Sequence, residues 1–195
     1  MRRVPVGPVT KGATDMALES TMVPLGTPAP DFSLPDLRGN VRSLAEFTAP
    51  ALLVAFVCNH CPYVKHIEDR FGEFAAAAEN LDVVAVCAND AEGYPDDTPE
   101  KLAEQAVRAS WAFPYLVDAD QAVARAYKAV CTPDFFLYGP DRLLAYRGAF
   151  DGSTPGNGVP VTGDLMRAAV ASVVVGEPVP EPHRPSMGCS IKWRS

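Results

Sequence analysis

The chain has 195 residues, is 48% hydrophobic, and carries a formal net charge of −7 with a pI near 4.9. This length can bury a core and fits one domain with extensions, so two full domains are not expected. An acidic surface argues against nucleic acid and membrane as partners, because both require a basic surface. No stretch of about 18 apolar residues occurs, and the first residues make a poor signal peptide, so we expect a cytoplasmic protein.

Both ends of the chain are rich in proline and glycine. Residues 1–22 are expected to be a loose leader outside the fold. Residues 23–176 contain the apolar segments of the domain. Residues 177–195 begin with a proline-rich, extended arm that has too little apolar surface to pack alone. The tail that follows contains Ile191 and Trp193, and we expect it to dock on the domain.

The domain begins with a hairpin and two buried strands. Phe32 and Leu34 precede a turn at residues 36–40, which predicts a hairpin before the first central strand. Continuous apolar runs at 52–57 and 82–88 predict strands that are buried on both faces, as parallel strands in a covered sheet are.

Helices and shorter strands follow in alternation. The helix between the two buried strands is marked by an apolar stripe at helical spacing: Val64, Ile67, Phe71, Phe74, Ala75 and Ala78. Beyond it we expect a helix that starts at the Thr98 cap, a strand at 115–117, a helix at 120–127, a hairpin of 135–138 with 143–146, and a last helix capped by Thr162. This order predicts an α/β sandwich with a mixed sheet and helices on both faces.

A Cys-x-x-Cys motif joins the first buried strand to its helix. A thiol with a pKa of about 8.5 is mostly protonated at pH 7, and a helix N-terminus stabilises the anion. Because Pro62 is tolerated only in the first turn, we expect the helix to start at about Asn59 or His60, with Cys58 acidified at its positive end. The helix terminus alone lowers the pKa of Cys58 by too little, so His60 is the candidate residue for lowering it further. With Cys61 as second thiol, this pattern indicates a redox site that should be open to substrates.

A second motif strengthens this interpretation. Cys131-Thr132-Pro133 places a proline at the entrance to a strand, where it cannot donate a hydrogen bond to the neighbouring strand. A cis peptide bond at this position would be held by the tertiary structure. Together with the Cys-x-x-Cys it resembles the thioredoxin superfamily. The segment Ala-Pro-Asp-Phe-Ser-Leu-Pro at 29–35 looks like the alkyl hydroperoxide reductase/thiol-specific antioxidant branch, and the closing Gly-Cys-Ser-Ile-Lys-Trp looks like a soluble, thioredoxin-like subgroup of redoxins. The resemblance implies a thioredoxin-like three-layer sandwich with an N-terminal β-hairpin extension.

The resemblance also implies roles for individual residues. Cys58 would be the attacking thiolate, Cys61 the resolving thiol and Pro133 the cis-proline opposite them, while Thr132 would lend its backbone to an extended substrate segment. Substrates would be protein or small-molecule disulfides, with a cellular dithiol as reductant and no cofactor. Because His60 stands where thioredoxin has proline, we expect a potential above thioredoxin's value of about −270 mV.

A thiol peroxidase that uses the same cysteines is the alternative within this family, with peroxides as substrates. Peroxiredoxins carry Pro-x-x-x-Thr-x-x-Cys, but with Cys61 as the peroxidatic cysteine the threonine position is Cys58 and the proline position is Val54. Both departures weaken this interpretation. Arg147, which follows a strand like the arginine that polarises peroxide, favours it, although such an arginine is more often a solvated hairpin residue.

Three accessory possibilities remain from the residues. Cys189, in the apolar tail, is a candidate third redox thiol, and Cys131 is either a packed structural thiol or a further neighbour of the dithiol. A copper or zinc carrier, or a redox sensor, is the alternative from another class. We expect no metal, since the cysteine spacing of copper carriers is one residue longer and a second Cys-x-x-Cys for zinc is missing. The sequence leaves the oligomeric state open.

Overall fold

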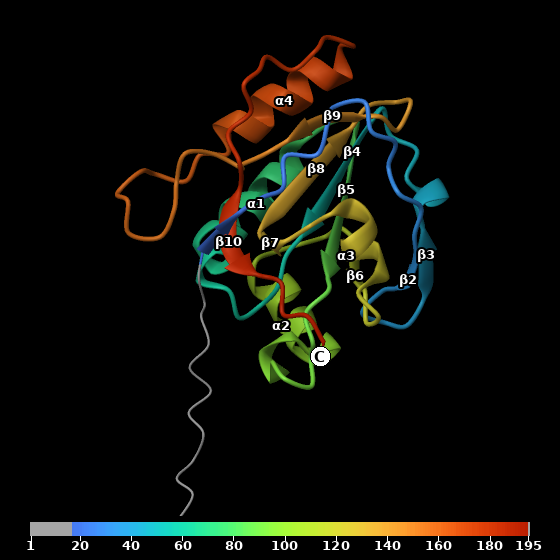
Figure 1. Ribbon diagram of the computed structural model, residues 1–195, viewed down its shortest axis with the longest axis vertical. Helices are drawn as coiled ribbons and strands as arrows, with labels where there is room; N and C mark the ends of the chain where they lie inside the picture. The colour runs from blue at the N-terminus through green and yellow to red at the C-terminus, as the bar shows by residue number, and fades with distance from the viewer. Residues whose placement is uncertain (1–16, 195) are drawn as a thin grey trace, which may run out of the picture.

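The computed structural model describes residues 17–194, and its elements follow the expected order (Figure 1). The strands are β1 (Ala17–Glu19), β2 (Ser33–Pro35), β3 (Val41–Ser43), β4 (Ala51–Phe56), β5 (Leu81–Cys87), β6 (Tyr115–Val117), β7 (Cys131–Thr132), β8 (Asp134–Tyr138), β9 (Leu144–Arg147) and β10 (Met187–Ser190). The helices are α1 (Pro62–Ala77), α2 (Pro99–Arg108), α3 (Ala122–Tyr127) and α4 (Asp164–Val174), with 3-10 turns η1 (Leu44–Glu46) and η2 (Pro95–Asp97). None of these helices is long and apolar enough to cross a membrane.

A mixed five-stranded sheet forms the centre of the molecule, as the order of elements predicted. Its strand order is β6-β5-β4-β8-β9, with β4, β5 and β6 parallel and β8 and β9 antiparallel to their neighbours. The two long apolar runs of the sequence are therefore the central pair β4 and β5. All of β4 and the last five residues of β5 are buried, which explains why these segments are apolar.

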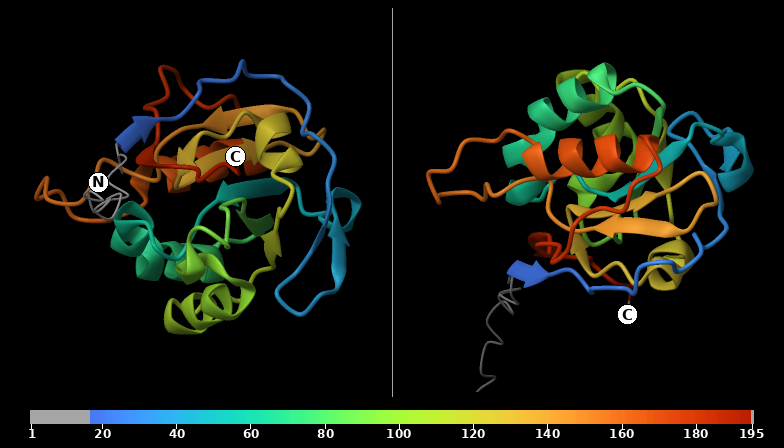
Figure 2. Two further views of the ribbon diagram at one scale, coloured as in Figure 1. Left: turned by 60° about the horizontal axis from the view of Figure 1, so that its bottom comes forward. Right: turned by 90° about the horizontal axis from the view of Figure 1, so that it is seen from above.

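Alternate residues of β4 point to opposite faces of the sheet and build two separate cores. Leu53 and Ala55 pack with the apolar stripe of α1 and with α4, whereas Leu52 and Val54 pack with α3 and the N-terminal hairpin. Figures 1 and 2 show this arrangement as layers, with α1 and α4 on one side of the sheet and α3 with β2 and β3 on the other. The three-layer sandwich is confirmed.

One helix start differs from the expectation. The N-cap of α4 is Gly163, at a φ of +66°, rather than Thr162. The backbone N–H groups of both residues donate to the Asp151 carboxylate, at 2.8 and 2.7 Å, so a side chain from a distant loop fixes the position of the turn. A local capping pattern does not contain that contact.

Both chain ends join in a second, three-stranded sheet with the order β1-β10-β7. The expected loose leader falls largely on residues 1–16, which lie outside the described residues. Its last part is ordered, because Ala17–Glu19 pair with Met187–Cys189 as β1 and β10. The tail pairs with β7, the strand that ends at Thr132. The small sheet therefore brings the tail to the predicted redox site.

Candidate active site

The Cys-x-x-Cys motif lies between the carboxyl end of β4 and the start of α1. The helix begins at Pro62 with Cys61 as its N-cap residue, so the expected start at Asn59 or His60 is wrong. The backbone N–H groups of those two residues are engaged elsewhere, since they donate to Asp97 Oδ1 at 2.8 and 3.1 Å. The positive end of the helix is therefore at the second cysteine rather than the first.

Three sulfur atoms and one threonine meet at this point. Cys58 Sγ lies 3.2 Å from Thr132 Oγ1, and Cys61 Sγ lies 3.1 Å from the Thr132 carbonyl oxygen and 2.7 Å from Cys189 Sγ. All five cysteines of the chain are reduced. Cys189, named from the sequence as a candidate, thus lies beside the dithiol although it is far along the chain.

The dithiol is buried, which contradicts the expectation of a site open to substrates. Cys58 and Cys61 are 0% exposed, and Cys189 is 2% exposed. The physical reason is the tail: β10 pairs with β7 so that Cys189 lies opposite Thr132 and covers the sulfur atoms. Any reaction with an external molecule therefore requires a rearrangement that exposes the sulfur atoms.

The charge of the dithiol also differs from the expectation. Burial, the hydrogen bond to Cys61 and the negative charge of Asp97 raise the pKa of Cys58 well above its usual range. The pKa of Cys61 is lowered because the thiols of Cys189 and Cys58 hydrogen bond to its sulfur, with a further contribution from the Val64 N–H. Of the two motif cysteines, Cys61 at the helix terminus is thus the one whose pKa is lowered in this closed arrangement.

Asp97 is the functional residue that sequence reasoning missed. Its carboxylate is 2% exposed, accepts the two loop N–H groups described above and the Asn89 amide at 2.8 Å, and lies 2.6 Å from His60 Nδ1. It holds the loop between the cysteines. An acidic residue just before the Thr98 helix cap gives no local signal of this role, because the contact joins η2 to a loop nearly forty residues earlier.

The charge of His60 is matched by that of Asp97. Burial lowers the pKa of His60 and the hydrogen bond to Asp97 raises it, with a raised pKa as the net result. The pKa of Asp97 is lowered, because the hydrogen bonds from His60 and Asn89 outweigh its burial. A positive charge on His60 is therefore accompanied by the negative charge of Asp97, and the two offset each other at the sulfur atoms.

Cys58, His60 and Asp97 also form a group that could hold a metal ion, with ligand atoms within 4.8 Å of one another. The oxygens of Asp97 already accept hydrogen bonds from the loop backbone and from Asn89. These bonds give the carboxylate a structural role without an ion, so the arrangement favours a loop support over a metal centre.

Thr132 and Pro133 lie where the family resemblance placed them. The bond between them is cis, and Thr132 touches both sulfur atoms of the dithiol. The backbone of Thr132, expected to bind an extended substrate, pairs instead with Cys189 of the same chain. The predicted substrate edge is thus occupied by the tail.

Cys131 and Arg147 lie outside this cluster. Cys131 is 0% exposed, its thiol faces the Pro133 carbonyl oxygen at 3.7 Å, and burial raises its pKa. Arg147 is 8% exposed, so it is not a solvated hairpin residue, and its Nε and Nη1 have no hydrogen-bond partner among the described residues. Burial lowers the pKa of its guanidinium.

A network of polar side chains from α1 and α2 contacts the loop that carries the first cysteine. Gln105, which is 0% exposed, donates from Nε2 to the Cys58 carbonyl oxygen and to Glu68 Oε2, both at 3.2 Å. Arg108 donates to Glu68 at 2.8 Å and to Asn59 Oδ1 at 3.0 Å. Helices α1 and α2 are thereby linked to the loop of the motif.

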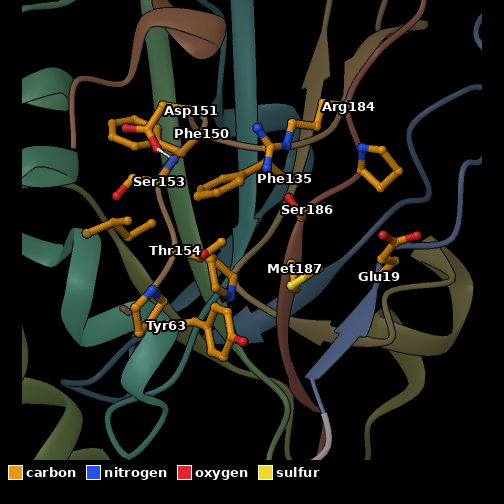
Figure 3. Close-up of a pocket in the computed structure, with 15 residues that line it drawn as sticks. Glu19, Tyr63, Phe135, Phe150, Asp151, Ser153, Thr154, Arg184, Ser186 and Met187 are labelled. Carbon is orange, nitrogen blue, oxygen red and sulfur yellow. Dashed lines mark hydrogen bonds between the residues drawn. The ribbon is translucent and has the colours of Figure 1, made fainter. Parts of the chain in front are cut away.

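A small pocket of about 90 Å³ opens beside the cis-proline. Figure 3 shows it between two groups of side chains, with Tyr63, Ser153 and Thr154 on one side and Arg184 and Met187 of the C-terminal arm and tail on the other. Pro133 lines this pocket, whereas the two cysteines of the motif do not. The pocket is therefore a surface opening close to the dithiol, and the tail forms one of its walls.

Asp134, directly after the cis-proline, supplies the first prediction. It is 0% exposed with Oδ1 unpartnered among the described residues, and burial raises its pKa to about 8. The folded protein therefore holds a proton that the unfolded chain loses above pH 4, so this residue costs stability as pH rises from about 4 to 8. Asp134→Asn is expected to raise the free energy of unfolding by about 1.5 kcal/mol at pH 5 and by several kcal/mol at pH 8.5. Urea unfolding at both pH values checks this, and an equal difference at both would contradict it.

Comparison with known proteins agrees with the fold. The sequence profile of the AhpC/TSA family matches residues 25–147. A thiol-disulfide oxidoreductase ResA from Geobacillus kaustophilus (strain HTA426) is 28% identical over 131 residues, which cover 64% of this chain and 68% of that protein.

Two solved structures are similar over nearly the whole chain. A hypothetical protein from Sinorhizobium meliloti 1021 is 49% identical with a TM-score of 0.89, covering 91% of this chain and 98% of its own. An uncharacterized conserved protein from Geobacillus kaustophilus is 45% identical, also with a TM-score of 0.89, covering 92% and 97%. Both extend beyond the segment that the family profile matches, so the resemblance includes chain outside that segment.

Proposed function

Because this chain belongs to the AhpC/TSA family, we propose that it is a thiol–disulfide oxidoreductase that works through Cys58 and Cys61. One observation supports this most: the two sulfur atoms lie against the Thr132 backbone and hydroxyl, beside a cis-proline. The ResA relative is named for the same type of reaction.

The reaction begins when β10 leaves β7 and an extended disulfide substrate takes its place. Cys58 attacks one substrate sulfur, the substrate S–S bond breaks, and a mixed disulfide forms. Cys61 then attacks Cys58, releases the reduced substrate and leaves a Cys58–Cys61 disulfide. A dithiol reductant restores the two thiols, so electrons pass from that reductant to the substrate.

Movement of the tail also changes the difference in pKa between the two cysteines. The hydrogen bond from Cys189 is the largest cause of the lowered pKa of Cys61. When the tail leaves, this cause disappears and the pKa of Cys61 rises. The preference for Cys61 over Cys58 therefore weakens in the open form, in which Cys58 has to act as the nucleophile.

We consider a peroxidase and a metal carrier to be less well supported than this function. Arg147 makes no hydrogen bond to either sulfur among residues 17–194, and Asp97 of the candidate metal group is engaged with the loop. A peroxidase needs a cation beside the reacting sulfur, since the cation stabilises the thiolate and the negative charge that develops on the departing peroxide oxygen.

Reduction of insulin and of hydroxyethyl disulfide by dithiothreitol tests the proposal. The wild-type protein is expected to accelerate at least one of these reactions, and the double variant Cys58→Ser/Cys61→Ser neither of them. Cys131→Ser is the matched control, because it removes a buried thiol beside the site and is expected to keep the activity. Peroxide-dependent thiol loss without any disulfide reduction would instead identify a peroxidase, and bound copper or zinc in the purified protein a carrier.

A further inference from the structure

The C-terminal strand occupies the sheet edge next to the cis-proline as a peptide substrate would. In the register of β10 with β7, Cys189 lies opposite Thr132 and Ser190 opposite Cys131, and the Ile191 N–H donates to the Val130 carbonyl at 2.9 Å. Addition of a strand to an exposed edge is a common way to bind an extended peptide. Here the added strand belongs to the same chain and carries a cysteine at the sulfur cluster.

Gly188 allows this close approach. A Cβ atom at this position would lie 1.9 Å from the Thr132 carbonyl oxygen and 3.0 Å from the Pro133 nitrogen, both of them backbone atoms. Any side chain at residue 188 would push β10 away from β7. The glycine therefore sets the depth at which Cys189 enters the site.

Residues beyond Cys189 hold the strand in register. Gln121 donates to the Lys192 carbonyl and accepts from the Arg194 N–H, each at 2.9 Å, and the Arg125 guanidinium lies 4.4 Å from the centre of the Trp193 ring. Polar and cation–π contacts on this scale fix a strand without making it permanent. The tail is thus held in place yet able to leave.

The sulfur atoms are placed for a reaction between Cys189 and Cys61. Their separation of 2.7 Å is about 0.7 Å longer than a disulfide bond of about 2.05 Å, so a bond needs only a small displacement. Both side chains are at least 98% buried, which excludes external thiols from the same position. A sulfur that served only to fill the core would not need to meet a redox cysteine.

We propose that Cys189 is a third redox thiol, which exchanges with the Cys58–Cys61 disulfide at Cys61. This proposal rests on the proposed function. Cys189 loses its proton and attacks Cys61, the Cys58–Cys61 bond breaks, and the electron pair leaves with the sulfur of Cys58, which takes up the proton. One disulfide is exchanged for another, so no further oxidant or reductant is needed. The resulting oxidised protein has a Cys61–Cys189 disulfide and Cys58 as a thiol.

Tryptic mapping of the oxidised protein tests this step. The reduced chain is oxidised with trans-4,5-dihydroxy-1,2-dithiane or diamide, its remaining thiols are alkylated, and it is digested with trypsin without reduction. Cys58 and Cys61 are in peptide 43–65, whereas Cys189 is in peptide 168–192, because the bond between Arg184 and Pro185 resists trypsin. We expect peptides 43–65 and 168–192 joined by a disulfide, with Cys58 alkylated. Cys189→Ser is expected to give only the bridge within peptide 43–65.

Gly188→Ala displaces the strand without removing a sulfur. It is expected to lower the yield of joined peptides about tenfold and to speed alkylation of the reduced dithiol by at least about tenfold, since access controls thiol reactivity. Gly139→Ala, in the β8–β9 turn where a Cβ would lie 3.2 Å from only the Asp141 side chain, is the matched control and is expected to change neither.

The outcomes separate the two proposals. A bridge confined to peptide 43–65 in the wild-type protein, with Cys189 alkylated, would overturn the role of Cys189. If the same sample still reduces disulfides, the proposed function stands. A joined peptide in which Cys58 replaces Cys61 would also overturn it. If the wild-type protein does not accelerate disulfide reduction, the proposed function is overturned, whichever bridge forms.

Discussion

Replacement of Cys61 by serine is expected to trap a covalent complex between Cys58 and a disulfide substrate. The first exchange joins Cys58 to the substrate, and without the resolving thiol that mixed disulfide persists. Turnover in the insulin assay is expected to fall about a hundredfold or more, as it does when a group essential to a covalent mechanism is removed. Non-reducing electrophoresis and intact mass with a disulfide-bonded peptide detect the complex.

This experiment needs a chain that also carries Cys189→Ser, because Cys189 is a further thiol that can resolve the complex. In that background Cys58→Ser is expected to lose turnover to a similar extent without trapping substrate. The opposite pattern, with a complex in Cys58→Ser and none in Cys61→Ser, would assign the attack to Cys61. That assignment would agree with the pKa values of the closed form, in which the pKa of Cys61 is lowered and that of Cys58 is raised.

Replacement of Asp97 by alanine is expected to destabilise the protein by about 3 to 5 kcal/mol, as loss of one partner from a buried ionic network does. The variant leaves two loop N–H groups, the Asn89 amide and the His60 ring without their acceptor. Urea unfolding under reducing conditions measures the loss. Asp96→Ala is the matched control, since this neighbouring carboxylate is exposed and its replacement should change stability by less than about 0.5 kcal/mol.

The same pair gives a signed pH dependence. The raised pKa of His60 adds stability that is present below about pH 6.5 and is lost as pH rises through the raised value. The lowered pKa of Asp97 adds stability that is present above about pH 4 and is lost in more acidic solution. The stability difference between the wild-type protein and Asp97→Asn is therefore expected to be largest between about pH 4 and 6.5. A difference that grows from pH 6 to pH 9 would contradict the pairing.

Much of the fold follows from local patterns. The apolar runs of β4 and of Val83–Cys87 in β5 predict central parallel strands, because a strand covered on both faces carries apolar residues in succession. The stripe from Val64 to Phe74 predicts α1 because residues three and four apart share one face of a helix. Element boundaries depend on contacts that are not local. Asp97 in η2 accepts the N–H groups of the loop just before α1, and Asp151 accepts those at the start of α4.

The sequence alone also determined the chemistry that is available: two cysteines before a helix, a proline at a strand entrance and a further cysteine near the end. Tertiary structure decided which of them meet. Pairing of β10 with β7 places Cys189 beside Cys61 and buries the dithiol, and Asp97 offsets the charge of His60. These contacts join segments from 37 to 128 residues apart, and their energies depend on distances and burial that no local spacing encodes.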